Sequence, residues 1–296
     1  MKKQILAASV AAALALPAMA QPTLYGRIDT AARSTDGEFS TVSGSFLTSV
    51  IGLKSTEDIG SGFKAHVWLE GSMDAYSGSV GRSDRGLFNR EASLTLETPA
   101  GSLTFGRTDA SDTSGFDAWT GIQNIGNFSF FPFLAGSWTR DRSNVIRYAS
   151  PRMAGLQLQV GHVEASNDGP ETDTASVNYR SGPLAVYIGA DDAAIGEYKG
   201  AGARYDFGFA AVGAAYAELT GPTNLKAQSY TTKVPLPGNF SAMGSYRITD
   251  TNGTETKSLT AGLSKNLSKR TQLLAFYQDN TGTNKDFFQV GLLHTF

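Results

Sequence analysis

Apolar and polar side chains alternate at every second position along most of the chain. The stretch 63–70, with the sequence FKAHVWLE, shows the pattern clearly, because its odd-numbered residues are all apolar. Successive side chains of a β-strand point to opposite faces, so this period predicts strands with one apolar and one polar face. The pattern recurs along the chain and predicts about sixteen strands, the second of them at 46–55.

The connections between these strands fall into two classes. Tight connections containing Pro, Gly or other turn-forming residues are predicted at 99–101, 152–155, 181–183, 206–208, 235–238 and 267–270. More polar and mostly longer connections are predicted at 71–85, 165–173, 193–197, 250–255 and 280–285. Short turns at one end and longer loops at the other are typical of a transmembrane β-barrel, whose short turns are periplasmic.

One segment, from Thr108 to Arg142, interrupts the alternation. Its aromatic residues are Phe116, Trp119, Phe128, Phe130, Phe131, Phe133 and Trp138, and its acidic residues include Asp109, Asp112 and Asp117. So long a connection in a chain of short turns is usually functional or disordered. The large aromatic side chains argue against disorder, because they bury enough apolar area to offset the entropy of ordering. We interpret the segment as a packed functional loop.

Two architectures accommodate this many strands. A soluble β-sandwich would bury one face of each strand and would need protected sheet edges. A closed barrel is favoured, because the strands are similar in length, no domain-sized break separates them, and an open sheet of this size tends to curl or split. The final strand places Phe288, Val290, Leu292 and Phe296 on one apolar parity, which suits barrel assembly by closure against the first strand. We therefore expect an all-β, sixteen-stranded antiparallel transmembrane β-barrel.

The first twenty residues have the features of a secretory signal peptide. Lys2 and Lys3 precede an apolar stretch at 5–16, and an A-x-A site ends at Ala20. The apolar stretch is short for a membrane-spanning helix, so an uncleaved anchor is the weaker alternative. We expect cleavage after Ala20, export through the inner membrane, and a single barrel at 21–296.

Composition excludes several kinds of chemistry. The chain has no cysteine, which rules out disulfides, thiolate metal sites and cysteine nucleophiles. Its formal charge is −2, so nucleic-acid binding has no support. Metal-binding signatures and a phosphate-binding loop are absent, and we expect no metal and no cofactor. An outer-membrane hydrolase is the enzyme alternative, but His66, His162 and His294 are not grouped with a nucleophile, so we expect no enzyme.

Six sequence blocks carry a resemblance to a known family. They are 23–29 (TLYGRID), 52–60 (GLKSTEDIG), 101–107 (GSLTFGR), 144–151 (NVIRYASP), 267–271 (LSKRT) and 291–296 (GLLHTF). In this order they resemble the general trimeric porins of Gram-negative outer membranes, in particular those of beta-proteobacteria and Neisseria. The resemblance covers the whole chain after the signal peptide.

The resemblance implies a third extracellular loop that folds into the lumen and narrows the pore. Strand order makes 108–142 that constriction loop, with its carboxylates facing a basic wall. The wall residues that the resemblance indicates are Arg27, Arg107 and Arg147, and the alternation of its strand adds Lys54. Alternation places all of them but Arg107 on the polar parity. Arg107 shares the parity of Leu103 and Phe105, so it reaches the lumen only if its strand bulges or ends there.

The function implied is passive diffusion of small hydrophilic solutes and ions through a water-filled pore, with charge biasing which ions enter. The alternative is a substrate-selective channel whose loop aromatics track sugar or aromatic solutes. Implied partners are two further copies of the chain in a homotrimer, outer-membrane lipid and lipopolysaccharide, and the barrel-assembly machinery. Val50, Leu293 and Thr295 stand where many relatives carry basic residues, which argues against strong anion preference.

Overall fold

The protein, seen in a computed structural model, is described at residues 21–110, 142–281 and 286–296. The predicted signal peptide and most of the predicted constriction loop lie outside these residues. Within them the chain is almost entirely strand, with a single 3-10 turn at Pro237–Asn239. No helix in this part of the chain is long and apolar enough to cross a membrane.

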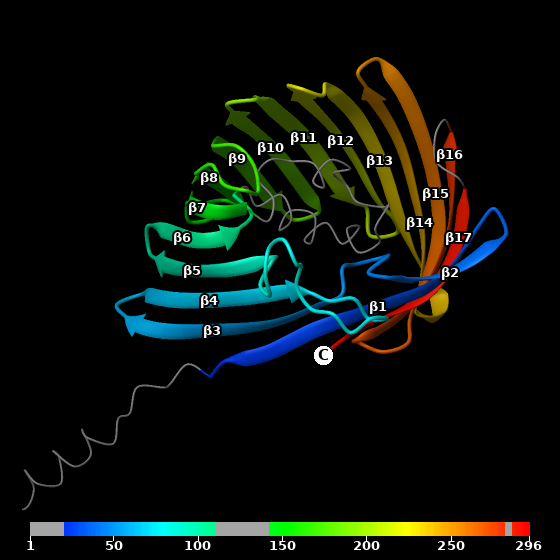
Figure 1. The fold of residues 1–296 in the computed structure, drawn as a ribbon, viewed down its shortest axis with the longest axis horizontal. Helices are drawn as coiled ribbons and strands as arrows, with labels where there is room; N and C mark the ends of the chain where they lie inside the picture. Colours follow the sequence, from blue (N-terminus) through cyan, green and yellow to red (C-terminus); the bar gives the residue numbers. More distant parts are fainter. Residues whose placement is uncertain (1–20, 111–141, 282–285) are drawn as a thin grey trace, which may run out of the picture.

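Seventeen strands are assigned in the described residues. They are β1 Thr23–Thr35, β2 Glu38–Ser43, β3 Val50–Gly60, β4 Phe63–Ser72, β5 Glu91–Thr98, β6 Gly101–Thr108, β7 Arg142–Ala149, β8 Leu156–Val163, β9 Thr172–Ser181, β10 Leu184–Ala193, β11 Gly196–Asp206, β12 Ala211–Thr220, β13 Leu225–Leu236, β14 Phe240–Thr251, β15 Thr254–Asn266, β16 Thr271–Thr281 and β17 Phe287–Thr295. All form one antiparallel sheet, and β1 pairs with β17 from Arg27 opposite Thr295 to Thr35 opposite Phe287. The sheet is therefore a closed barrel (Figure 1).

The seventeen strands fill sixteen positions, because β2 and β3 share one. The lower part of β1, Thr23 to Arg27, pairs with β3, and its upper part, Thr30 to Thr35, pairs with β2. The sixteen-stranded barrel is thus confirmed, but the predicted second strand at 46–55 is wrong at its start. Residues 44–49 leave the wall between β2 and β3.

Alternation along the strands separates an apolar outside from a polar inside. Leu24 is 64% exposed and Ile188 is 56% exposed, whereas the inward-facing Asn178 and Gln289 are fully buried. A soluble protein shows the opposite arrangement, with its apolar side chains inside. A lipid-facing apolar surface around a polar interior is the transmembrane barrel pattern.

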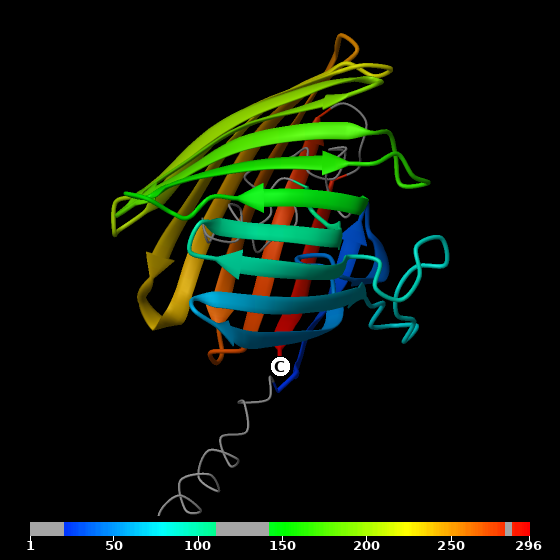
Figure 2. The same ribbon diagram turned by 90° about the vertical axis from the view of Figure 1, so that its left-hand side faces the viewer.

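The two ends of the barrel differ in their connections. Figure 2 shows the loops 73–90 (cyan) and 164–171 (green) projecting from one end, while short turns close the other. Short turns occur at the looped end as well. Asn252 and Gly253 join β14 to β15 with φ of 52° and 86°, the left-handed conformations of a two-residue hairpin. The predicted loop at 250–255 is therefore shorter in the structure, because β14 continues to Thr251 and β15 begins at Thr254.

Candidate functional site: the pore wall

The interior of the barrel holds two of the predicted basic residues on neighbouring strands. Arg27 on β1 donates from Nε to the backbone oxygen of Thr48 at 2.7 Å. The ammonium group of Lys54 on β3 lies 4.0 Å from the ring centroid of Trp68 and 4.8 Å from that of Tyr25. A cation over aromatic rings is attracted by the ring quadrupole. Both side chains are therefore held at the inner wall.

A buried carboxylate next to these cations was not predicted. Glu70 accepts hydrogen bonds from the Tyr25 hydroxyl at 2.7 Å and from Arg90 Nε at 2.8 Å, and Tyr25 in turn accepts from Trp68 Nε1. The Glu70 side chain is 8% exposed, so water screens this ion pair little. The alternation of β4 already placed Glu70 on the polar parity, and that is the signal that could have found it.

Arg107 is buried at an irregularity in β6. The pairing of β6 with β7 shifts register between Gly106 and Thr108, and Gly106 has a φ of 123°, which favours glycine. The ladder with β5 runs without a shift, with Arg107 opposite Ala92 and Phe105 opposite Leu94, so an inward direction of Arg107 stays a prediction. Arg107 Nε donates to the backbone oxygen of Asn89 at 2.6 Å.

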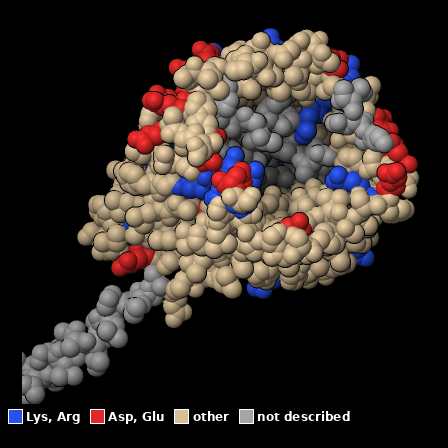
Figure 3. All heavy atoms as spheres, viewed as in Figure 1, with Lys and Arg blue, Asp and Glu red and all other residues tan. Residues whose placement is uncertain are grey.

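The partner of Arg107 is Asp168, which lies in the loop between β8 and β9. Asp168 Oδ2 accepts from Arg107 Nη1 at 2.7 Å and from Ser143 Oγ at 2.6 Å, and Oδ1 lies 3.3 Å from Arg85 Nε. Partial burial raises the pKa of Asp168, but the hydrogen bonds from Ser143 and Arg107 outweigh it and lower the pKa to about 2. One ionised carboxylate thus joins β6, β7 and both long loops. Figure 3 shows basic and acidic atoms gathered at the rim of the central hollow, over loop 73–90.

The fourth predicted wall residue, Arg147 on β7, contacts the start of the predicted constriction loop. Its Nη1 donates to the backbone oxygen of Asp109 at 2.7 Å. Asp112, Asp117 and the seven predicted loop aromatics lie outside the described residues. The opposition of loop carboxylates and wall cations therefore stays a prediction, as does the aromatic track for selected substrates.

Further inward-facing cations on the described strands were not among the predicted wall residues. They include Arg33 on β1, Arg180 on β9, Arg204 on β11, Lys233 on β13 and Arg247 on β14. Arg180 and Arg204 both lie opposite Ala185 of the strand between them, so they share one row of the sheet. The parity of each strand identifies these cations, because each shares its parity with buried small or polar residues such as Ser176, Ser229 and Ser245.

Comparison with known proteins places this architecture in a family. A family model described as Gram-negative porin matches residues 7–285. The chain belongs to the Gram-negative porin family. It is therefore an outer-membrane porin, through which small hydrophilic solutes and ions diffuse passively, and its family consists of channels.

Individual relatives of the porin are distant but cover much of the chain. An outer membrane porin protein of Bordetella pertussis is 28% identical over all of both chains. Outer membrane porin protein 32 of Delftia acidovorans is 29% identical over 99% of this chain and 92% of that protein. The major outer membrane protein P.IB of Neisseria meningitidis is 30% identical over 64% of this chain and 58% of that protein. The beta-proteobacterial and neisserial resemblance is thus confirmed.

Solved structures share the fold of the porin. The anion-selective porin from Comamonas acidovorans superposes with a TM-score of 0.79 and 21% identity, over 94% of this chain and 100% of that one. OmpF of Salmonella typhi superposes with a TM-score of 0.73 and 15% identity, over 94% and 98% of the two chains. At these identities the likeness concerns the fold alone.

Proposed function

We propose that the porin forms a homotrimer in which each barrel conducts ions with only a weak preference for anions or cations. The observation that carries this proposal is the pairing of luminal charge. Arg107 is matched by Asp168 and Arg90 by Glu70, and the buried inward carboxylates Asp29, Glu91 and Asp191 offset part of the charge of the remaining inward cations. Val50 and Leu293 on the inner face supply no charge that would replace them.

A planar bilayer separates the parts of this proposal. Purified porin should give stepwise conductance, and its reversal potential in a salt gradient should stay close to zero. A reversal potential near the limit for either ion would contradict weak selectivity, while leaving conduction intact. Chemical cross-linking of membranes should yield a species with the mass of three chains. Recovery of single chains alone would contradict the trimer.

We also propose a transverse field between the constriction loop and the wall. Asp109, Asp112 and Asp117 would provide its negative side, and Arg27, Lys54, Arg107 and Arg147 its positive side. Changing the three aspartates to asparagine together should shift selectivity toward anions. If the reversal potential is unchanged, these carboxylates lie away from the ion path.

The partners proposed for the outside of the barrel follow from its surface. The exposed outward side chains of β5, β6 and β8, among them Leu94, Phe105 and Val160, form an apolar wall that fits lipid tails. Lipopolysaccharide around the outer rim, and the barrel-assembly machinery during insertion, complete the proposal.

A further inference from the structure

Residues 44–49, here called the inner knob, are an even-numbered insertion in the barrel wall. If the pairing of Thr30 with Ser43 continued along β1, Arg27 would face residue 46, but it faces Val50, four residues further on. Shifting a strand by an odd number would exchange its lipid and luminal faces. Because the shift is four, β2 and β3 both keep their alternation while the extra chain leaves the wall.

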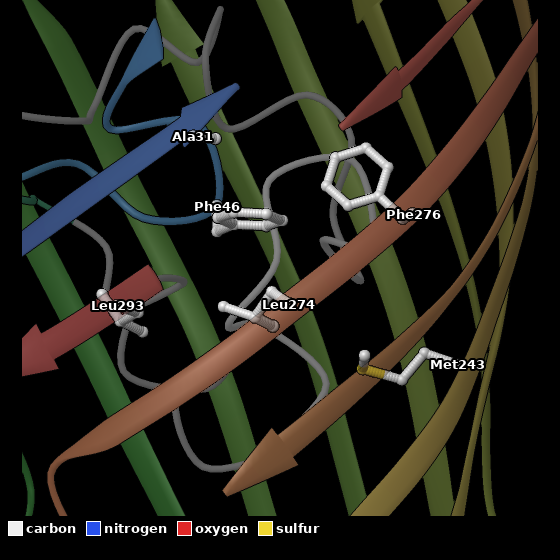
Figure 4. Packing of buried hydrophobic residues seen from close by; sticks show 6 residues of the cluster. All are labelled: Ala31, Phe46, Met243, Leu274, Phe276 and Leu293. Atoms are coloured by element: carbon white, nitrogen blue, oxygen red, sulfur yellow. The ribbon is translucent and has the colours of Figure 1, made fainter. Parts of the chain in front are cut away.

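The knob turns inward, where an apolar patch receives it. Phe46 is 1% exposed and packs edge-to-face against Phe276, with ring centroids 5.2 Å apart and planes at 79°. Figure 4 shows Phe46 directed toward Phe276 and Leu274. The rest of the patch, from the inner faces of β1, β14 and β17, comprises Ala31, Met243 and Leu293.

Small residues make room for the aromatic ring. A Cβ added to Gly291 on β17 would lie 2.6 Å from a ring carbon of Phe46, which is closer than real Cβ contacts come. Ala31 is the residue opposite Gly291 in the register of β1 and β17. The wall is therefore shaped to accept Phe46, and the inward course of the knob is not an incidental bend.

Polar groups hold the backbone of the knob. The Asp29 carboxylate oxygen Oδ2 accepts hydrogen bonds from the backbone N–H groups of Phe46, at 2.7 Å, and Leu47. The backbone N–H of Asp29 donates to Ser49 Oγ at 2.9 Å. A carboxylate that accepts backbone N–H groups forms strong, charge-assisted bonds. Asp29 thus replaces the ladder bonds that the knob gives up by leaving the wall.

Side chains of β1 and β17 secure the flanks of the knob. Gln289 Oε1 accepts from Ser45 Oγ at 2.7 Å and from Arg33 Nε at 3.1 Å, and Arg33 Nη2 also donates to Ser45 Oγ at 2.9 Å. On the other flank Arg27 donates to the backbone oxygen of Thr48. The knob is consequently a fixed feature of the inner wall.

The knob lies at the mid-height of the barrel. Asp29 is the central residue of β1, Phe276 of β16 and Gly291 of β17. We propose that the inner knob is a pore-narrowing element, separate from the predicted constriction loop, that limits the size of solutes passing the β1, β16 and β17 side of the lumen. The luminal surface on this side is then formed by Leu47 and Thr48 of the knob, which are both partly buried.

Deleting residues 46–49 tests the proposal directly. Gly44 and Ser45 would then bridge Ser43 to Val50, and one continuous register would run along β1. We expect a folded barrel with higher single-channel conductance, and faster swelling of liposomes in large neutral sugars relative to glycerol. Unchanged conductance and an unchanged size limit in the folded deletion variant would overturn the proposal.

Phe46→Ala provides a second variant if the deletion fails to fold. Loosening the knob should raise conductance and admit larger sugars. Phe39→Ala is the matched control, because Phe39 lies on the same hairpin and is 83% exposed outside the pore. If Phe46→Ala lowers the unfolding temperature but leaves conductance and the size limit as in Phe39→Ala, the knob is only a packing element and the proposal is wrong.

The absence of cysteine allows a third, independent measurement. Thr48→Cys introduces a single thiol on the knob. A cationic methanethiosulfonate reagent should lower its conductance, because the added group would lie in the ion path. Phe39→Cys should react without a change in current. Reaction at both positions without an effect on either current would contradict a luminal knob.

Discussion

The walls β1–β8 and β9–β17 are built from the same alternating strands, yet they differ in regularity. In the first wall, β1 changes partner at the inner knob, β6 bulges before Arg107, and loops 73–90 and 164–171 meet at Asp168. In the second, ladders run without a shift, as from Leu225 opposite Thr251 to Leu236 opposite Phe240. Departures from regular pairing thus gather in the first wall, while the second wall lines the pore with side chains on an undisturbed ladder.

The largest expected effect comes from altering register in the regular wall. Deleting Ser245 alone should exchange the lipid and luminal faces for the rest of β14 and prevent barrel formation. The four-residue deletion in the knob should be tolerated, because its length is even. Heat-modifiable migration on gels measures the folded fraction of both variants. If the Ser245 deletion and the deletion of residues 46–49 fold to the same extent, the proposed difference between the regular wall and the knob is wrong.

Removing the carboxylate at the junction of the two long loops should have a smaller effect. Asp168→Asn removes the anion that Arg107 and Arg85 share and should cost about 2 kcal/mol of unfolding free energy, the value of hydrogen bonds to a charged group. The anion-to-cation permeability ratio should rise about fourfold, because one charge acting across about 10 Å of water favours the anion about twofold and disfavours the cation about twofold.

Asp192→Asn is the matched control for this change, since Asp192 is exposed at the same end of the barrel but on its outer side. Unfolding by denaturant and reversal potentials measure the two effects. The selectivity change should fade in about 1 M salt, where the Debye length is about 3 Å. A shift that persists at high salt would indicate an altered pore shape and not a direct effect of charge.

The same carboxylate predicts a pH dependence of stability. The pKa of Asp168 is lowered to about 2 in the folded porin, and an unfolded aspartate has a pKa of about 3.9. Its stabilising contribution is therefore complete above the unfolded value and is lost as the pH falls through the folded value. The difference in unfolding temperature between wild type and Asp168→Asn should be constant from pH 7 to 5 and should shrink toward pH 2. A difference that is independent of pH would show that the ionised carboxylate is not its source.

The smallest expected effect concerns Lys54. Its ammonium group faces the rings of Trp68 and Tyr25, an exposed cation–π arrangement worth about 0.5–1 kcal/mol. Lys54→Gln should shift the reversal potential slightly toward cations and leave folding intact, whereas Lys265→Gln, on the outer face of β15, should change neither. An equal shift in both variants would mean that Lys54 does not act from the lumen.

The alternation of side chains and the turn-forming residues correctly predicted features that depend on residues close together in the sequence. The period of two established the strands and their faces, and Pro and Gly located most of the tight turns. The parity conflict at Arg107 even indicated a bulge, because an arginine on an apolar parity requires a change of register. The start of the predicted second strand was wrong, since Phe46 and Leu47 look locally like the beginning of an apolar strand.

What the sequence determined by itself is the all-β barrel, its two faces and its unequal ends, because alternation and turn chemistry act between residues close along the chain. Tertiary structure alone decided where the wall is broken and which charges meet. Asp168 lies between Asn167 and Gly169 and looks like an ordinary turn residue, yet the side-by-side pairing of β6, β7 and β8 brings it to Arg107, which is 61 positions away. Phe46 likewise leaves the wall because Gly291 and Phe276, near the far end of the chain, form the surface that receives it.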